Sequence, residues 1–230
     1  MFFLKMKRGR QGKKGKGGAM SSGFTLVELM VTVAIFIFMT ILVVANYGSF
    51  NNGTLLTSMS YDVALTLRDA QSYGLNVQGY GSSNTYVYNY PYGIHFSSAL
   101  GSNNQMILFA DSSNNVPNGI CDNGGTGVCT PTQTTGDGII TAYTIARGGI
   151  VSSLCAGSGP GNACISTTVL DITFKRPDPN AVIVVPVSGS SCTTNASPCA
   201  YAEIKVEDAA KTSTRTIIVR STGEIAVPNQ

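Results

Sequence analysis

The sequence has few charged side chains and a single histidine. Charged residues make up 12% of the 230 residues, about half the share in a typical soluble domain. This composition excludes a coiled-coil rod, a charge-rich disordered chain and a collagen-like repeat. A Ser-His-Asp site could be built only around His95, which lies in an apolar strand pattern without a G-x-S-x-G motif nearby. We therefore expect a structural role for His95 and no enzymatic activity.

Positive charge is concentrated at the N-terminus. Seven of the 15 Lys and Arg residues lie within the first 16 positions, and all twelve acidic residues come later. If the chain is cut after Gly23, eight basic and twelve acidic side chains remain, for a formal charge of −4. The isoelectric point near 8.5 then describes a precursor, and it gives no argument for nucleic-acid binding.

A long apolar run follows this basic stretch. From Phe24 to Ala45, 18 of 22 residues are apolar, and a helix of that length spans ~33 Å, enough to cross a bilayer core. The basic flank predicts a cytoplasmic N-terminus. A secretory signal peptide is one alternative, but the run is longer than the apolar region of such a peptide and contains Glu28. A plain membrane anchor is another, and it leaves Glu28 unexplained.

Glu28 is the most informative residue of this run. A carboxylate inside a spanning segment costs roughly 2.5–3.5 kcal/mol on insertion scales, which favours a functional role. The alternative is a glutamate near the membrane face whose carboxylate reaches water. The residues around it decide between these readings.

The segment Gly23-Phe-Thr-Leu-Val-Glu28, with its basic leader and apolar run, resembles the leader junction of type IV pilins and type II secretion pseudopilins. The resemblance implies that a prepilin peptidase cuts after Gly23 and that the new N-terminal Phe24 is N-methylated. It also implies that Thr25 and Glu28 serve assembly. The expected division is a leader over residues 1–23, removed on processing, and a transmembrane and polymerisation helix over 24–45.

The segment over residues 46–80 is expected to join the membrane helix to a head domain. Asn46–Thr54 is rich in Gly and Asn and is a poor helix by propensity. It is either a loop that ends the membrane helix or a soft section of one long helix that melts during assembly. From Leu55 to Val77 an amphipathic helix is predicted, because apolar residues recur at a spacing of three or four. These are Leu56, Met59, Val63, Leu67 and Ala70.

Residues 81–230 are predicted to form a β-rich head. Short apolar or alternating runs separated by Gly-rich turns indicate antiparallel strands. The expected fold class is therefore α+β, with one long N-terminal helix packed on antiparallel sheets. The predicted strands are 85–90, 93–96, 105–110, 139–146, 149–151, 169–174, 181–185, 202–206, 214–220 and 224–227, with a turn at Thr222–Gly223 before the last.

The order of these pieces is similar to the GspH/FimT-like branch of pilin-like proteins. The resemblance rests on Arg68–Gly74, on Tyr92–Phe96, on a strand that runs into an Asp/Asn loop, and on a closing hairpin with Thr222–Ile225. It implies a structural subunit without a cofactor, whose partners are the peptidase, other pilin subunits and an inner-membrane assembly platform.

Six cysteines form three pairs of near neighbours with seven, eight and six residues between them: Cys121 and Cys129, Cys155 and Cys164, Cys192 and Cys199. Zinc sites prefer tighter spacing. An even count on an exported chain indicates disulfides. Fifteen pairings are possible, and sequence proximity favours the three local ones, each within a loop and each worth roughly 2–3 kcal/mol. The alternative is that one or more pairs stay reduced.

Three further features carry weaker hypotheses. A loop with Asp111, Asn114, Asn115 and Asp122 could offer oxygens to calcium, but its spacing departs from known calcium loops, and turn formation is the commoner explanation. Arg215 and Arg220 could contact DNA. However, Arg215 and Arg220 are five positions apart, which places them on opposite faces of a regular strand. Nearby acidic residues also neutralise the positive charge of the region.

The last of these is a tyrosine-rich stretch. Tyr86, Tyr88, Tyr90 and Tyr92 alternate along the sequence and, with Tyr80, could form an adhesive or stacking surface. Because alternate residues share one strand face, sheet packing is the commoner role for such a pattern.

The sequence therefore predicts a subunit of a type IV pilus or secretion pseudopilus. It would reside in the inner membrane before assembly, with its N-terminus in the cytoplasm, and in a surface filament afterwards. The alternative is a low-copy minor pilin or pseudopilin whose head binds a partner subunit, a secreted protein or DNA. A third reading is a singly anchored exported protein that never polymerises.

Overall fold

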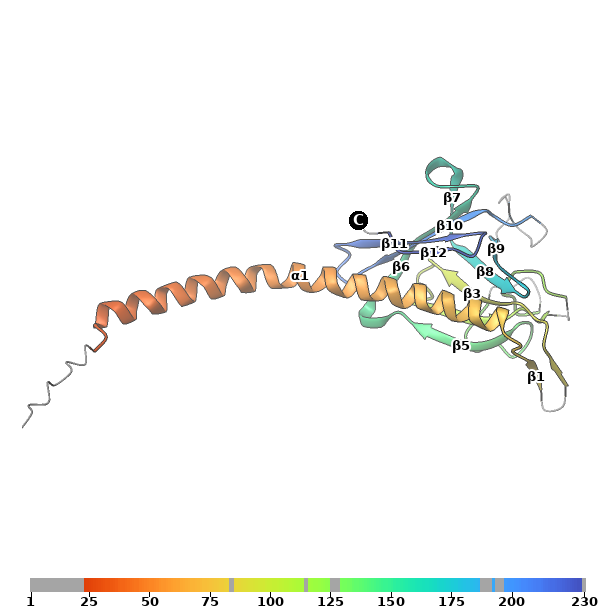
Figure 1. Cartoon of the computed structure of the whole chain (residues 1–230), viewed down its shortest axis with the longest axis horizontal. Coiled ribbons are helices and arrows are strands. Elements are labelled where there is room, and N and C mark those ends of the chain that lie inside the picture. The colour runs from red at the N-terminus through yellow and green to blue at the C-terminus, as the bar shows by residue number, and fades with distance from the viewer. Residues whose placement is uncertain are drawn as a thin grey trace, which may run out of the picture. The chain divides into compact units, whose positions relative to one another are not determined.

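The structure is a computed structural model that describes residues 23–82, 85–113, 116–124, 129–186, 192 and 197–228 (Figure 1). The chain divides into two compact units, residues 1–47 and residues 48–230, and each is described by itself. The fold class is α+β, with an N-terminal apolar helix and antiparallel sheets. Most of the predicted leader lies outside the described residues.

Helix α1 runs from Leu26 to Leu75 without a break. It continues through Asn46–Thr54, so the prediction of a loop at this point is wrong. The alternative prediction, one long helix, agrees with the backbone. Helix propensity is a weak preference that neighbouring turns can override. The helix ends before Asn76, whose amide donates to the Ser72 carbonyl at 3.0 Å.

Within the second unit, the apolar stripe predicted on α1 is confirmed. All five of its residues are at most 2% exposed: Leu56, Met59, Val63, Leu67 and Ala70. They pack in one hydrophobic cluster with strands of both large sheets, including Ile94, Ile172 and Ile204. Gly74 allows the last turn to approach strand β8 (Val169–Lys175), since a Cβ at this position would collide with the backbone of Phe174. This part of the helix therefore packs on the core by one face, while Tyr61 and Leu65 on other faces stay exposed.

Among the described residues the strands form two five-stranded sheets and one two-stranded ribbon, all antiparallel (Figure 1). The first sheet has the order β12 (Ile225–Ala226), β11 (Thr214–Arg220), β10 (Tyr201–Glu207), β6 (Ile150–Gly157) and β7 (Cys164–Thr167). The second has the order β5 (Gly138–Thr144), β4 (Gln105–Ala110), β3 (Tyr92–Ser97), β8 (Val169–Lys175) and β9 (Asp178–Val184). The ribbon pairs β1 (Tyr80–Ser82) with β2 (Thr85–Val87).

Most predicted strands are confirmed, but several differ. Strand β1 was not predicted, and β2 ends at Val87 instead of residue 90. Strand β6 extends to Gly157, six residues beyond its predicted end, and β7 was not predicted. The sequence between Ser152 and Thr167 is rich in Ser and Gly and has little strand propensity of its own. It becomes extended because β6 pairs with the whole of β10. The extended conformation of the β6–β7 hairpin is therefore determined by tertiary pairing and not by its local sequence.

The tyrosine stretch does not share one strand face, so that prediction is wrong. Strand β2 ends at Val87, and Tyr92 belongs to β3 in another sheet. Tyr92 is buried, whereas Tyr86 and Tyr88 are about half exposed, with ring centroids 6.4 Å apart. Pro91 and the turn before it interrupt the alternation, because proline cannot donate to a strand ladder.

Candidate functional site

The predicted cleavage junction lies in exposed, non-helical chain immediately before α1. Gly23 and Phe24 precede the helix and are exposed. Thr25 caps it: the Thr25 hydroxyl accepts the Glu28 amide hydrogen at 3.2 Å, and the Thr25 carbonyl accepts the Leu29 amide hydrogen at 3.1 Å. A threonine cap with a glutamate three residues later is the sequence of a capping box. The junction therefore ends where the helix begins.

The helix beyond this cap has an exposed apolar surface. Leu26–Ala45 is the one described helical segment long and apolar enough to cross a membrane, and none of it is buried. Phe36 is 75% exposed and Val43 67%, so large apolar side chains face outward on several sides. A helix that is apolar all round suits burial in lipid or among other helices.

The polar residues inside this segment differ in how they are satisfied. Thr32 donates its hydroxyl hydrogen to the Leu29 carbonyl at 2.9 Å, and Thr40 donates to the Phe36 carbonyl at 2.7 Å. Such bonds within the helix let a hydroxyl enter an apolar environment without an outside partner. Among the described residues, the Glu28 carboxylate makes no hydrogen bond or ion pair. Glu28 is therefore the group of this segment that requires a partner from outside it once water is removed.

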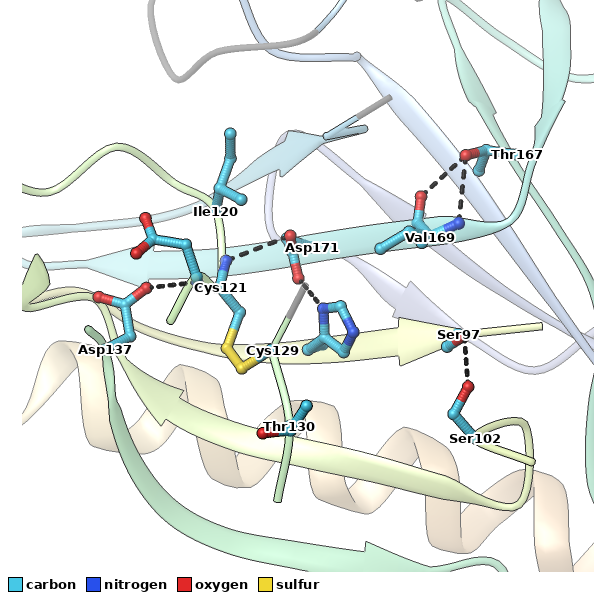
Figure 2. A network of polar contacts seen from close by, with 12 residues as sticks. Ser97, Ser102, Ile120, Cys121, Cys129, Thr130, Asp137, Thr167, Val169 and Asp171 are labelled. Carbon is cyan, nitrogen blue, oxygen red and sulfur yellow. Dashed lines mark hydrogen bonds and ion pairs between the residues drawn. A yellow bond between two sulfur atoms is a disulfide. The ribbon is translucent and has the colours of Figure 1, made fainter. Parts of the chain in front are cut away.

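In the head, His95 and Asp171 form a buried pair. They are direct neighbours across β3 and β8, with His95 Nδ1 and Asp171 Oδ1 2.7 Å apart. The second Asp171 oxygen accepts the Cys121 amide hydrogen at 3.2 Å (Figure 2). Burial raises the pKa of Asp171, and His95 lowers it. Both side chains are almost inaccessible, so the pair attaches the Cys121 loop to the sheet, a structural role.

The carboxylates of the proposed calcium loop are engaged by the chain itself. Asp111 accepts the amide hydrogens of Asn118 and Gly119 at 3.1 and 2.7 Å. Asp122 accepts from the Gly124 amide and the Asn118 side chain at 2.8 and 3.0 Å. The other two candidates, Asn114 and Asn115, lie outside the described residues. These contacts support turn formation.

Asp137 organises the same loop, and the sequence analysis missed it. One oxygen accepts the amide hydrogens of Ser112 and Ser113, both at 2.7 Å. The other accepts that of Asp122 at 2.9 Å (Figure 2). Burial raises the pKa of Asp137 to about 6 and the pKa of Asp111 to about 7. The backbone amide hydrogen bonds that each carboxylate accepts lower its pKa and so oppose this effect. No spacing in the sequence relates Asp137 to a segment 25 residues earlier.

The two arginines considered for DNA contact are held apart. Arg215 lies within 3.3 Å of the Thr57 hydroxyl of α1. Arg220 forms an ion pair with Glu224 at 3.1 Å and lies over the Tyr201 ring, 5.8 Å from its centroid. The structure does not bring them to one surface.

All six cysteines are in disulfides, in the three pairs that sequence proximity favours. Cys121–Cys129 packs in a small cluster with Ile107 and Phe109. The Cys192 carbonyl accepts the amide hydrogen of Val185, the residue after β9, at 2.9 Å, and the Cys199 amide donates to the Ile183 carbonyl of β9 at 2.8 Å. Cys155–Cys164 differs from the expected loop position, because it lies within the β6–β7 hairpin.

No protein-family model, curated protein or solved structure matches this chain. The function is therefore argued from the junction, the exposed helix and the head.

Proposed function

We propose that this chain is a structural subunit of a type IV pilus or type II secretion pseudopilus, of the GspH/FimT-like branch. It is made as a prepilin, cut after Gly23, methylated at Phe24 and polymerised through residues 24–45. The observation that carries the proposal is the Glu28 carboxylate, which makes no ion pair with any residue that the structure describes. It lies in an exposed apolar helix, one turn after the Gly23–Phe24 junction.

Cleavage would supply the missing partner. It creates an α-ammonium on Phe24, four residues or about one helical turn from Glu28. In a core of packed apolar helices, an isolated charge is costly, whereas a hydrogen-bonded ion pair is tolerated. A pair formed between the ammonium of one subunit and Glu28 of its neighbour would also set the register of assembly.

The rest of the helix suits such a core. Burial of its apolar surface drives association, at about 25 cal/mol for each Å² removed from water. Thr32 and Thr40 already bond to carbonyls of their own helix, so they add no unsatisfied group. Glu28 is then the residue that specifies how neighbouring helices align.

The disulfides of the head favour a location outside the cytoplasm. Three disulfides link two of its loops and the β6–β7 hairpin, and disulfides persist in oxidising compartments. We propose that the chain first lies in the inner membrane with its N-terminus in the cytoplasm. There it meets the prepilin peptidase and the assembly platform, and it then joins other pilin subunits in a surface filament.

The test is mass spectrometry of sheared surface filaments, without reduction, on intact protein and N-terminal peptides. We expect an abundant species that begins at methylated Phe24 and is six hydrogens lighter than the fully reduced chain. An uncut chain that keeps residues 1–23 would overturn the proposal and favour a plain membrane anchor. A cut chain present in the membrane but absent from filaments would favour the low-copy minor subunit instead.

A further inference from the structure

The Cys155–Cys164 disulfide lies on the outer face of the first sheet, next to a carboxylate. Cys155 is directly opposite Glu203 across β6 and β10, and Cys164 is on the adjoining strand β7 (Figure 1). Ligand atoms of these three residues lie within 4.8 Å of one another. They line a solvent-open pocket together with Ser153, Ser166 and Lys205.

This disulfide is more accessible than the other two. Cys155 and Cys164 are half-buried, whereas the remaining cysteines are between 1% and 6% exposed: Cys121, Cys129, Cys192 and Cys199. Attack on a disulfide requires access to one of its sulfurs. We infer that Cys155–Cys164 is the bond a reductant opens first, and that its two thiolates with Glu203 then bind a soft divalent cation such as Zn²⁺.

The scaffold that holds the three ligands does not depend on the disulfide. Backbone ladders join β10 to β6 and β6 to β7 over their shared length, so the strands stay in place when the sulfur–sulfur bond opens. Ligands on adjacent strands are held more firmly than ligands on loops. Tetrahedral zinc with bonds of ~2.3 Å to sulfur needs donors roughly 3.5–4 Å apart. The two sulfurs must therefore separate from their bonded distance, while the Glu203 carboxylate already lies within 4.8 Å of both.

The chemistry of the three donors matches such a cation. Thiolate sulfur selects zinc and cadmium over magnesium and calcium, and a third ligand with a water would complete four-fold coordination. The Tyr201 hydroxyl donates to Glu203 at 2.6 Å, and a hydrogen bond of this kind orients a metal-binding carboxylate. Lys205, on the same strand face, opposes the charge of a cation and limits the affinity.

The disulfide-bonded and the metal-bound states of the hairpin exclude each other, because both use the same two sulfurs. A phosphine reductant attacks one sulfur and the sulfur–sulfur bond breaks. Water supplies the oxygen of the phosphine oxide. It also supplies two protons, one to each cysteine, so that both become thiols. Each thiol then loses its proton to solvent as the metal binds. The site therefore exists only in the reduced hairpin, and the inference does not depend on the proposed function.

The first step of the test uses the full chain in detergent, titrated with a phosphine and then alkylated. Peptide mass spectrometry should find Cys155 and Cys164 labelled at a reductant concentration that leaves the other four cysteines unlabelled. Labelling of either buried pair at the same or a lower concentration would overturn the inference.

The second step adds Cd²⁺ as the probe at that reductant concentration. We expect one equivalent to produce a thiolate-to-cadmium absorption band, absent from the oxidised chain. Glu203→Gln keeps both thiols and should weaken binding by about tenfold or more, and Tyr201→Phe by about tenfold. Glu207→Gln, on the same strand and opposite Ile150, is the matched control and should leave the affinity unchanged.

The outcomes are decisive because circular dichroism reports whether each variant keeps its fold. A folded, selectively reduced chain without the absorption band would overturn the site. Equal weakening by Glu203→Gln and Glu207→Gln would also overturn it, because binding would then follow general surface charge.

Discussion

The two ends of α1 place their apolar side chains in opposite environments. Between Leu26 and Ala45 apolar residues surround the helix and all are exposed. Between Leu56 and Ala70 most of them occupy one stripe and are buried against the sheets, and Leu65 on another face is exposed. The comparison teaches that the period of the apolar residues, more than their number, decides where a helix can be buried. One stripe suits one partner surface, whereas a fully apolar surface suits lipid or a bundle.

Polar groups differ between the two regions in the same way. Buried polar side chains of the head, such as Asp171 and Asp137, have partners within the chain. In the first part of α1 the threonines are satisfied by their own helix, and Glu28 is the exception on which the proposed assembly depends.

The largest expected effect is on assembly. Glu28→Leu should reduce filament yield by about a hundredfold or more, since it leaves the Phe24 α-ammonium buried without a partner, at a cost of about 3–5 kcal/mol. Cleavage after Gly23 and membrane insertion should be unaffected. Filaments are quantified by shearing and immunoblotting, and processing by N-terminal mass spectrometry. Thr32→Val, one turn further along the exposed helix, is the matched control and should assemble normally. Normal yield from Glu28→Leu would break the proposed role of the carboxylate.

The second effect contrasts neighbouring residues of the same helix. Leu67→Ala should lower the free energy of unfolding of the head by about 2–5 kcal/mol, because it leaves a cavity at a fully buried position. Leu65→Ala, two residues earlier and 57% exposed, should change it by about 0.5 kcal/mol or less. Denaturant titration followed by tyrosine circular dichroism measures both. Equal losses would mean that the outer face of α1 is also covered.

The third effect compares two disulfides of similar loop length. Removing Cys121–Cys129 or Cys155–Cys164 by paired Cys→Ala substitution should cost about 2–3 kcal/mol of unfolding free energy from loop closure. Their sequence separations are 8 and 9. The first pair should cost more, because its sulfurs are buried against Ile107 and Phe109. Denaturant midpoints of the two variants provide the comparison, and a larger loss from the half-buried pair would contradict it.

The fourth effect is a pH dependence confined to the head. Asp111 has a folded-state pKa raised to about 7 from 3.8, so the folded head holds a proton that the unfolded chain releases. Its contribution to stability is full below about pH 4 and declines as pH rises through 7. Relative to Asp111→Asn, the wild-type chain should therefore lose on the order of 2–3 kcal/mol between pH 5 and pH 8.

The Asp111→Asn variant will be less stable at every pH, because its amide nitrogen cannot accept the backbone hydrogens now bound by the carboxylate. The readout is therefore the difference in unfolding free energy between the two proteins across the pH range. A wild-type advantage that grows with pH would show that the amide donors outweigh burial at this site.

The smallest effect is at the surface of the head. Arg220 and Glu224 form an ion pair whose side chains are half exposed, and such pairs contribute about 0–1 kcal/mol. Glu224→Ala should shift the denaturant midpoint only slightly, and less so in high salt. A loss comparable to that of Leu67→Ala would show that this hairpin contributes to the core.

Much of the fold could be predicted because local patterns and tertiary packing agree. Strands Gln105–Ala110 and Thr214–Arg220 have the predicted bounds, since apolar or β-branched residues fill them and turn residues flank them. The β6–β7 hairpin could not be predicted, because its Ser- and Gly-rich sequence is extended only through pairing with β10. Asp137 was missed for a related reason: its partners are distant in sequence.

By itself the sequence determined the apolar helix, the buried stripe of α1 and the α+β class, and it contains the motif on which the proposed junction at Gly23–Phe24 rests. Each of these follows from residues that are near one another along the chain, through helix period, capping and strand alternation. Tertiary structure decided which acids are buried, that His95 meets Asp171, and that Glu203 lies beside Cys155. Those relations depend on strand order and register, which bring together residues that no local pattern connects.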